Sequence, residues 1–188
     1  MLGDLALGKL LRDYEFETVL DIGSGAGAQA QWMRRKGRQV ITIDPAAPSN
    51  VRGFYPCMQP PREAIWCCHV LEHQRDPGAF LDATWHDLEP AGILAITVPP
   101  FRAVVPGHVT AWNAGLLLYN LVLAGFDCSR AAVRTYGHNI SVIVRKGERP
   151  TANERDKLID IARYFPVPLT GERPRLGVVP TDISEVNW

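Results

Sequence analysis

One segment, residues 18–44, limits the fold of this chain more than any other. Its first five residues, Thr-Val-Leu-Asp-Ile, favour a buried strand that stops at Gly23. A glycine-rich turn, a helix over about residues 26–36 and a second strand over residues 39–44 follow. The connection is long enough for a right-handed crossover, so the segment predicts two parallel strands joined by a helix.

The rest of the chain continues this alternation. Asp76 and Pro77 offer an N-cap and a first-turn proline, which predict a helix to about Leu88. Five prolines between residues 45 and 62 predict irregular chain, with at most a stub of a third strand near Phe54. Further elements are expected as a helix at 2–12, a strand at 64–68, a turn at 89–92, a strand at 93–98, an apolar helix at 116–123 and an antiparallel pair within 126–135 and 139–145. This order predicts an α/β fold with a mostly parallel sheet and helices on both faces.

The length of 188 residues suits one core, which we expect in a single domain over residues 1–150. Thr151-Ala-Asn-Glu154 is a capping-box pattern, so residues 151–188 are expected to be a helix and a proline-rich tail packed on that domain or on a partner. The formal net charge of zero gives no indication of a nucleic-acid partner. The absence of a leader pattern, a long apolar run and metal-ligand cysteine spacing predicts a cytoplasmic protein with reduced thiols and no metal site.

Glycines and two carboxylates surround the first predicted crossover. Gly23, Gly25 and Gly27 follow the first strand, where ligands of open parallel sheets bind. The loop also fits a loose dinucleotide fingerprint, so a nicotinamide-dependent oxidoreductase stays an alternative. Asp21 argues against it, because a carboxylate there would repel a pyrophosphate and attract the ammonium of a methionine moiety. Asp44, at the end of the second strand, is expected to accept hydrogen bonds from ribose hydroxyls.

Four segments in order carry a resemblance to a known family. They are 19–27 (Val-Leu-Asp-Ile-Gly-Ser-Gly-Ala-Gly), 41–44 (Ile-Thr-Ile-Asp), 64–73 with its Leu-Glu-His ending, and 88–92 (Leu-Glu-Pro-Ala-Gly). Over roughly residues 18–145 the chain resembles class I S-adenosylmethionine (SAM)-dependent methyltransferases, in the small, broad group that includes the ubiquinone-biosynthesis type. The resemblance implies SAM as cofactor and a seven-stranded sheet with one antiparallel strand, in which the third strand is reduced here.

The resemblance also implies a cofactor site. Together with the glycine loop and the carboxylates, it predicts these cofactor-binding residues: Asp21, Gly23, Ser24, Gly25, Gly27, Asp44, Pro45, Cys68 and His69. His108 lies in the loop after the strand 93–98, where relatives line the acceptor pocket, and is the candidate general base. Nearby Trp112 is expected either to form an apolar wall of that pocket or to belong to the core.

These observations predict a methyltransferase that acts on an oxygen or nitrogen of a small molecule, metabolite or glycan. The acceptor and the oligomeric state stay open, and a homodimer or a partner subunit is compatible with the pattern. One alternative is a catalytically silent subunit of the same fold that supports a partner protein. The nicotinamide enzyme is the other.

Overall fold

The computed structural model describes residues 2–45, 50–53, 55, 59–102, 104–147, 161–169 and 179–188. Its elements are α1 Asp4–Asp13, β1 Thr18–Ile22, α2 Ala28–Arg35, β2 Gln39–Asp44, β3 Val51–Arg52, β4 Arg62–Cys68, η1 Leu71–His73, α3 Pro77–His86, β5 Leu88–Val98, α4 Ala114–Ala124, β6 Ala132–Tyr136, β7 Asn139–Arg145, η3 Ala162–Tyr164 and β8 Glu185–Val186. The unit β1-α2-β2 is confirmed, with Thr18 paired to Gln39 and Ile22 to Ile43 in parallel register.

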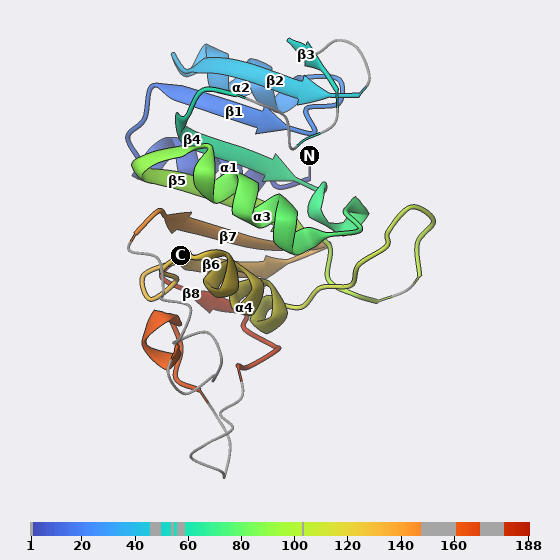
Figure 1. Cartoon of the computed structure of the whole chain (residues 1–188), viewed down its shortest axis with the longest axis vertical. Helices are drawn as coiled ribbons and strands as arrows, with labels where there is room; N and C mark the ends of the chain where they lie inside the picture. Colours follow the sequence, from blue (N-terminus) through green and yellow to red (C-terminus); the bar gives the residue numbers. More distant parts are fainter. Residues whose placement is uncertain are drawn as a thin grey trace.

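One sheet runs through the molecule in the order β3-β2-β1-β4-β5-β7-β6-β8 (Figure 1). The pairs from β3 to β5 are parallel, and those of β7 with β5 and with β6 are antiparallel. Strand order reverses between β1 and β4, so the carboxyl ends of these strands border the crevice where such sheets bind ligands. The third strand is confirmed as a stub, at Val51–Arg52 rather than near Phe54.

Helices cover both faces of the sheet, as expected. Alternate residues of β1 point to opposite faces, so Leu20 belongs to the core under α3 and α4 while Val19 belongs to the core under α1 and α2. In Figure 1, α3 and α4 lie in front of the sheet. Asp76 caps α3 by accepting a 2.9 Å hydrogen bond from the Ala79 amide, which confirms the predicted helix start.

The apolar helix α4 ends where the sequence predicts, at Gly125 with φ 108°. Its residues Leu117, Leu118, Leu121 and Val122 are all buried in the main core. Most of the apolar surface of α4 is therefore used inside the domain, while Leu116 near its start stays 40% exposed. Of the described helices, none is both long and apolar enough to span a bilayer.

Two predictions about the sheet were wrong in detail. Residues 89–92 are not a separate turn, because β5 already pairs at Leu88 with Arg62 and continues through a bulge that shifts the register before Ala64 and Ile93. The sheet has eight strands rather than seven, since the two-residue β8 pairs antiparallel with β6 through Val133 and Val186. The antiparallel part is thus larger than a single reversed strand.

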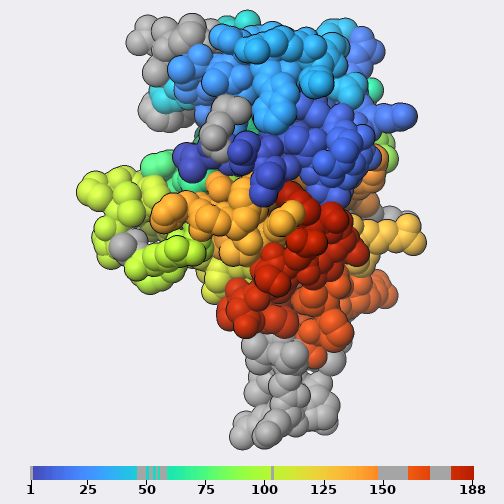
Figure 2. All heavy atoms as spheres, turned by 180° about the vertical axis from the view of Figure 1, so that it is seen from behind, coloured from blue at the N-terminus to red at the C-terminus, as the bar shows by residue number. Residues whose placement is uncertain are grey.

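The described parts of the C-terminal region lie on the domain. Ile161, Tyr164 and Phe165 join the core beneath α4, and Lys9 Nζ of α1 lies 5.6 Å from the centre of the Trp188 ring. Figure 2 shows the last residues, in red, beside the dark blue N-terminal helix. The helix predicted from residue 151 lies mostly outside the described residues, and the division of the chain at residue 150 stays a prediction.

Candidate functional site

A crevice opens at the carboxyl ends of β1, β2 and β4. It encloses about 300 Å³ and is bordered by Gly23, Asp44, Pro45, Tyr55 and His69, among others. Four of these five residues were predicted from the sequence to bind the cofactor. Tyr55 was not, because it lies in the proline-rich segment where no pattern indicated an ordered side chain.

The glycine loop passes close to the segment after β4. Gly23 has φ 72°, and a Cβ there would lie 2.2 Å from Val70 Cγ2, so no larger residue fits. Gly25 has φ 50°, but nothing lies within 4 Å of where its Cβ would be. The loop therefore packs tightly at its start and leaves its middle open for a ligand to approach the backbone.

Asp44 closes the other side of the crevice. Its Oδ2 accepts a 2.8 Å hydrogen bond from the Gly25 amide. The end of β2 is thereby tied to the glycine loop, and a carboxylate stands where the sequence predicted a ribose-binding group.

Asp21 is the deepest of the predicted site residues. Only 1% of it is exposed, and burial raises its pKa to about 7, with Arg34 opposing and Asp44 adding to the shift. Its Oδ2 has no hydrogen-bond partner among the described residues. It does not border the 300 Å³ crevice, because its side chain points to the face covered by α1 and α2, whereas Ile22 borders it.

Ser24 and Cys68 border a smaller cavity beside α2. This space of about 230 Å³ also touches Leu2 and Gln29, and the buried Ser24 Oγ has no hydrogen-bond partner among the described residues. Buried polar groups are nearly always hydrogen-bonded, so Asp21 Oδ2 and Ser24 Oγ are two buried oxygens at this end of the loop whose hydrogen-bonding capacity the described residues do not use. Gly27, the last predicted loop residue, precedes α2 as its N-cap.

His69 borders both the crevice and a second pocket of about 510 Å³. It holds the left-handed conformation with φ 58°, unusual for a residue with a side chain and costing on the order of 1–3 kcal/mol. Its Nε2 lies 3.0 Å from Asn139 Oδ1, and its Nδ1 lies 3.2 Å from Oε1 of the fully buried Glu72. Burial lowers the pKa of His69, but Glu72 and Asn139 outweigh burial and raise the pKa above its usual value.

The tautomer of His69 follows from its partners. Asn139 Oδ1 also accepts a 3.2 Å hydrogen bond from the Gly3 amide, so this atom is the oxygen and His69 Nε2 carries a proton. Nδ1 faces Glu72. Both ring nitrogens are therefore engaged, which explains how the strained backbone is kept in place. The sequence analysis did not predict Asn139 as a site residue. Its position directly after the β6–β7 turn, at the same end of the sheet as the crevice, could have suggested it.

The 510 Å³ pocket follows the loop after β5. His108 and Trp112 border it, together with Phe101, Arg102 and His138. His108 lies with its ring centre 4.9 Å from that of His73, whose Nδ1 is 2.8 Å from the Gly107 carbonyl oxygen. Trp112 is only 3% exposed and donates from Nε1 to Thr110 Oγ1, so it is both a core residue and a pocket wall.

Glu72, His73 and His108 bring one ligand-type atom each to within 4.8 Å of one another. Such a set could hold a divalent cation, although the sequence predicted no metal site. Part of this cluster has a structural role that needs no cation. The Glu72 carbonyl accepts from the amides of Val109 and Thr110, which ties η1 to the loop after β5.

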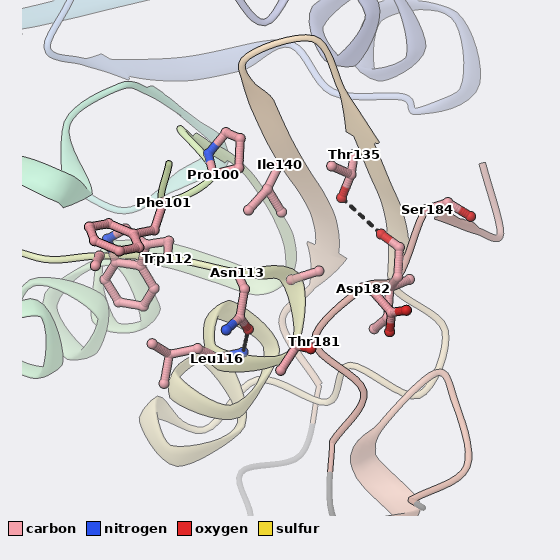
Figure 3. A pocket seen from close by; sticks show the side chains of 13 residues that line it. Pro100, Phe101, Trp112, Asn113, Leu116, Thr135, Ile140, Thr181, Asp182 and Ser184 are labelled. Carbon is pink, nitrogen blue, oxygen red and sulfur yellow. Dashed lines mark hydrogen bonds between the residues drawn. The ribbon is translucent and has the colours of Figure 1, made fainter. Parts of the chain in front are cut away.

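Figure 3 shows a third pocket, of about 580 Å³. It adjoins the second pocket, because the two have lining residues in common. The two share Phe101 and Trp112, whose backbones are joined by a 2.8 Å hydrogen bond from Phe101 N to Trp112 O. The far wall of the third pocket comes from the C-terminal residues 181–184, held to β6 by a 2.8 Å hydrogen bond from Thr135 Oγ1 to the Ile183 carbonyl.

A parallel sheet with a glycine loop and a crevice at its switch point defines a Rossmann-like α/β ligand-binding domain. The model of a family described as "Methyltransferase domain" matches residues 5–121. The chain therefore belongs to this methyltransferase family and has the class I SAM-dependent methyltransferase fold, as the resemblance predicted.

Individual relatives agree with this assignment. The chain is 33% identical over 99 residues to a ubiquinone biosynthesis O-methyltransferase of Xylella fastidiosa, covering 42% of this chain and 40% of the relative. It is 29% identical over 138 residues to a tRNA 5-carboxymethoxyuridine methyltransferase of Escherichia coli, covering 61% and 48%. The structure of a Burkholderia thailandensis 1,6-didemethyltoxoflavin-N1-methyltransferase with bound S-adenosylhomocysteine superposes with TM-score 0.66 at 17% identity, covering 77% of each chain. The chain spans less than half the length of these two curated relatives.

Proposed function

We propose that this chain binds SAM in the crevice at the first crossover and transfers its methyl group to an oxygen or nitrogen of a small molecule in the 510 Å³ pocket. The observation that carries the proposal is the position of His69, which borders both spaces. A donor held on one side of this residue and an acceptor on the other would meet there, so the two halves of a transfer reaction share one border.

The residues present fit such a cofactor. Asp44 offers a carboxylate to ribose hydroxyls, and the open backbone at Gly25 allows close approach of the ligand. Neither Asp21 nor Ser24 lines the crevice, but each has a buried oxygen with no hydrogen-bond partner among the described residues, and the proposal directs the charged amino-acid end of SAM towards these two oxygens. Pro45 and Tyr55 add a less polar wall of the crevice. His69 borders the crevice and Cys68 borders the smaller cavity beside α2, and the proposal places the methionine end of SAM near both residues.

SAM supplies a methyl group already bonded to a good leaving group, so the protein mainly has to orient the acceptor and exclude water. Trp112 and Phe101 provide apolar walls for this purpose. His108, at the same pocket, is the proposed base for an acceptor hydroxyl. His69 is less suited to that role, because both of its ring nitrogens are engaged.

Calorimetric titration with SAM and with S-adenosylhomocysteine tests the first half of the proposal. Saturable binding of either compound is expected, and its absence would refute the cofactor site. Incubation with isotopically labelled SAM and small-molecule extracts tests the second half. Binding without any labelled product, alone and with co-purified proteins, would favour the silent subunit.

A further inference from the structure

The 510 Å³ pocket, which is the proposed acceptor pocket, is lined by basic side chains and by no acidic side chain among the described residues. Four of its lining side chains can carry positive charge: Arg102, His69, His108 and His138. Among the described residues that line it, none is Asp or Glu. The Glu72 carboxylate is fully buried, lies 3.2 Å from His69 Nδ1 and within 4.8 Å of a His108 ring nitrogen, and does not line the pocket.

Of these four side chains, only Arg102 is always charged, and it lies at the edge of the pocket. Arg102 Nη2 donates a 3.3 Å hydrogen bond to the Gly137 carbonyl, so the guanidinium lies against the β6–β7 turn that also carries His138. Two separate elements, the loop after β5 and this turn, thus bring N–H donors together at one end of the pocket. A guanidinium retains further N–H groups that suit a carboxylate or another oxygen anion.

The rest of the pocket is apolar. Phe101 is 62% exposed and Val104 is 88% exposed, while Val109 and Trp112 complete the wall. Large apolar side chains that stay exposed around a pocket indicate a ligand that covers them. A flat, apolar ring system would pack against Phe101 and Trp112.

The neighbouring 580 Å³ pocket has the opposite charge. Among the described residues that line it, Asp182 is the only charged one, and Figure 3 shows it across the pocket from Phe101 and Trp112. An anion is therefore disfavoured on that side and favoured beside Arg102. The opposite charges of the two adjoining pockets favour one orientation of an acidic ligand, with its anionic end beside Arg102 and away from Asp182.

We propose that the acceptor is an organic acid: an apolar, ring-containing body with an anionic oxygen group, carboxylate or ionised hydroxyl, which Arg102 binds. Arg102 is then a specificity-determining residue. This inference rests on the proposed function, since it assigns the substrate class of the same pocket.

The test uses the whole chain saturated with S-adenosylhomocysteine and three small aromatic probes, of which the first two are matched in shape. These are 2-naphthoate, its uncharged counterpart 2-naphthamide, and 4-nitrophenol at a pH where it is ionised. Dissociation constants are measured for the native chain and for Arg102→Gln, Arg102→Lys and Arg130→Gln. Arg130 is an exposed arginine before β6, at the opposite edge of the sheet, and serves as the matched control.

We expect 2-naphthoate to bind at least about tenfold more tightly than 2-naphthamide, a difference of about 1.4 kcal/mol. Arg102→Gln should remove most of this preference, Arg102→Lys should keep part of it, and Arg130→Gln should keep all of it. If Arg102→Gln weakens the binding of 2-naphthoate but not that of 4-nitrophenolate, the site is specific for carboxylates. If it weakens the binding of both anions, the site also accepts ionised hydroxyls.

Two results would overturn the inference: equal affinity for the acid and the amide, or a preference that survives in Arg102→Gln. Either result with normal binding of S-adenosylhomocysteine refutes the acid acceptor alone. Failure to bind S-adenosylhomocysteine refutes the proposed function instead.

Discussion

The Gly25 amide and the Asp44 carboxylate are joined by a 2.8 Å hydrogen bond across the mouth of the crevice. This bond links the loop after β1 to the end of β2, two segments that the sequence assigned separately to one cofactor. Because neither Gly25 nor Asp44 belongs to the hydrophobic core, substitutions at these two positions can test the proposed SAM site.

Replacing Asp44 by alanine should weaken SAM binding by roughly ten- to a hundredfold, because hydrogen bonds to a charged acceptor contribute about 1.5–3 kcal/mol. Thermal stability should change little, since Asp44 is only half-buried at a strand end. Calorimetric titration of the variant checks this. An affinity equal to that of the native chain would mean that Asp44 only ties the loop.

The two loop glycines should respond differently to added bulk. Gly23→Ala places a Cβ 2.2 Å from Val70 Cγ2 and strains φ 72°, so it should destabilise the fold by about 1–3 kcal/mol. Gly25→Ala shares the strain of a positive φ but enters open space, so it should destabilise the fold less than Gly23→Ala and mainly weaken SAM binding. Denaturant unfolding and titration on both variants separate the effects. The reverse ranking would contradict the placement of the ligand beside Gly25.

The sequence predicted those parts of the fold whose cause is local. Strand periodicity with a glycine break sets β1 and its loop, the Asp76 side chain caps α3, and Gly25 and Gly125 occupy turns that few other residues tolerate. The bulge after Leu88 could not be predicted, because it depends on register with Arg62 in another strand.

The missed parts of the site depend on contacts between distant segments. Asn139 contacts His69 and Gly3, which are 70 and 136 residues away, and no spacing rule brings them together. Asp21 was predicted at the edge of the cradle, but strand alternation places its side chain behind the loop, under α1 and α2. Its link to the cofactor stays a prediction.

Asp21 should make folding stability depend on pH. Burial raises its pKa to about 7 from 3.8, so between these values the folded chain binds a proton that the unfolded chain does not. Stability should then fall as pH rises from about 4 to 7 and level off above. Urea unfolding across this range should show the slope, and Asp21→Asn should remove it and be more stable than the native chain at pH 8.

The same group should couple SAM binding to proton release. If Asp21 neutralises the ammonium of the ligand, binding favours its ionised form and releases a proton near pH 6. Binding enthalpies measured in buffers of different ionisation enthalpy should therefore differ at pH 6 and converge at pH 9. Asp21→Asn should bind SAM more weakly and lose this buffer dependence. Unchanged affinity in Asp21→Asn would assign Asp21 a purely structural role.

His108→Ala should lower kcat more than it changes KM if His108 removes a proton from the acceptor. Its side chain is partly exposed beside the 510 Å³ pocket, so folding should be little affected. The matched control is His86→Ala, which removes an exposed imidazole at the end of α3. Steady-state kinetics on an identified acceptor decide the matter, and an unchanged kcat would exclude His108 as the base.

Asn139→Ala should release two segments at once. Asn139 Oδ1 accepts from the Gly3 amide and from His69 Nε2, so its loss leaves the His69 ring with the ion-pair contact to Glu72 among these contacts. The pKa of His69 should fall, because one of the groups that raises it is gone. Asn139→Asp keeps an acceptor oxygen and adds negative charge, so it should raise that pKa above its value in the native chain.

NMR titration of the His69 ring measures both shifts, and the ordering Ala below native below Asp is the expected result. The raised pKa also predicts a linkage to stability, since a histidine that gains partners on folding stabilises the fold below its unfolded pKa and loses that contribution as pH rises through the folded one. Asn139→Ala should shrink this pH-dependent part and lower stability by about 1 kcal/mol. If His69 titrates identically in all three proteins, the contact with Asn139 does not control its protonation, and the strained φ of His69 must have another cause.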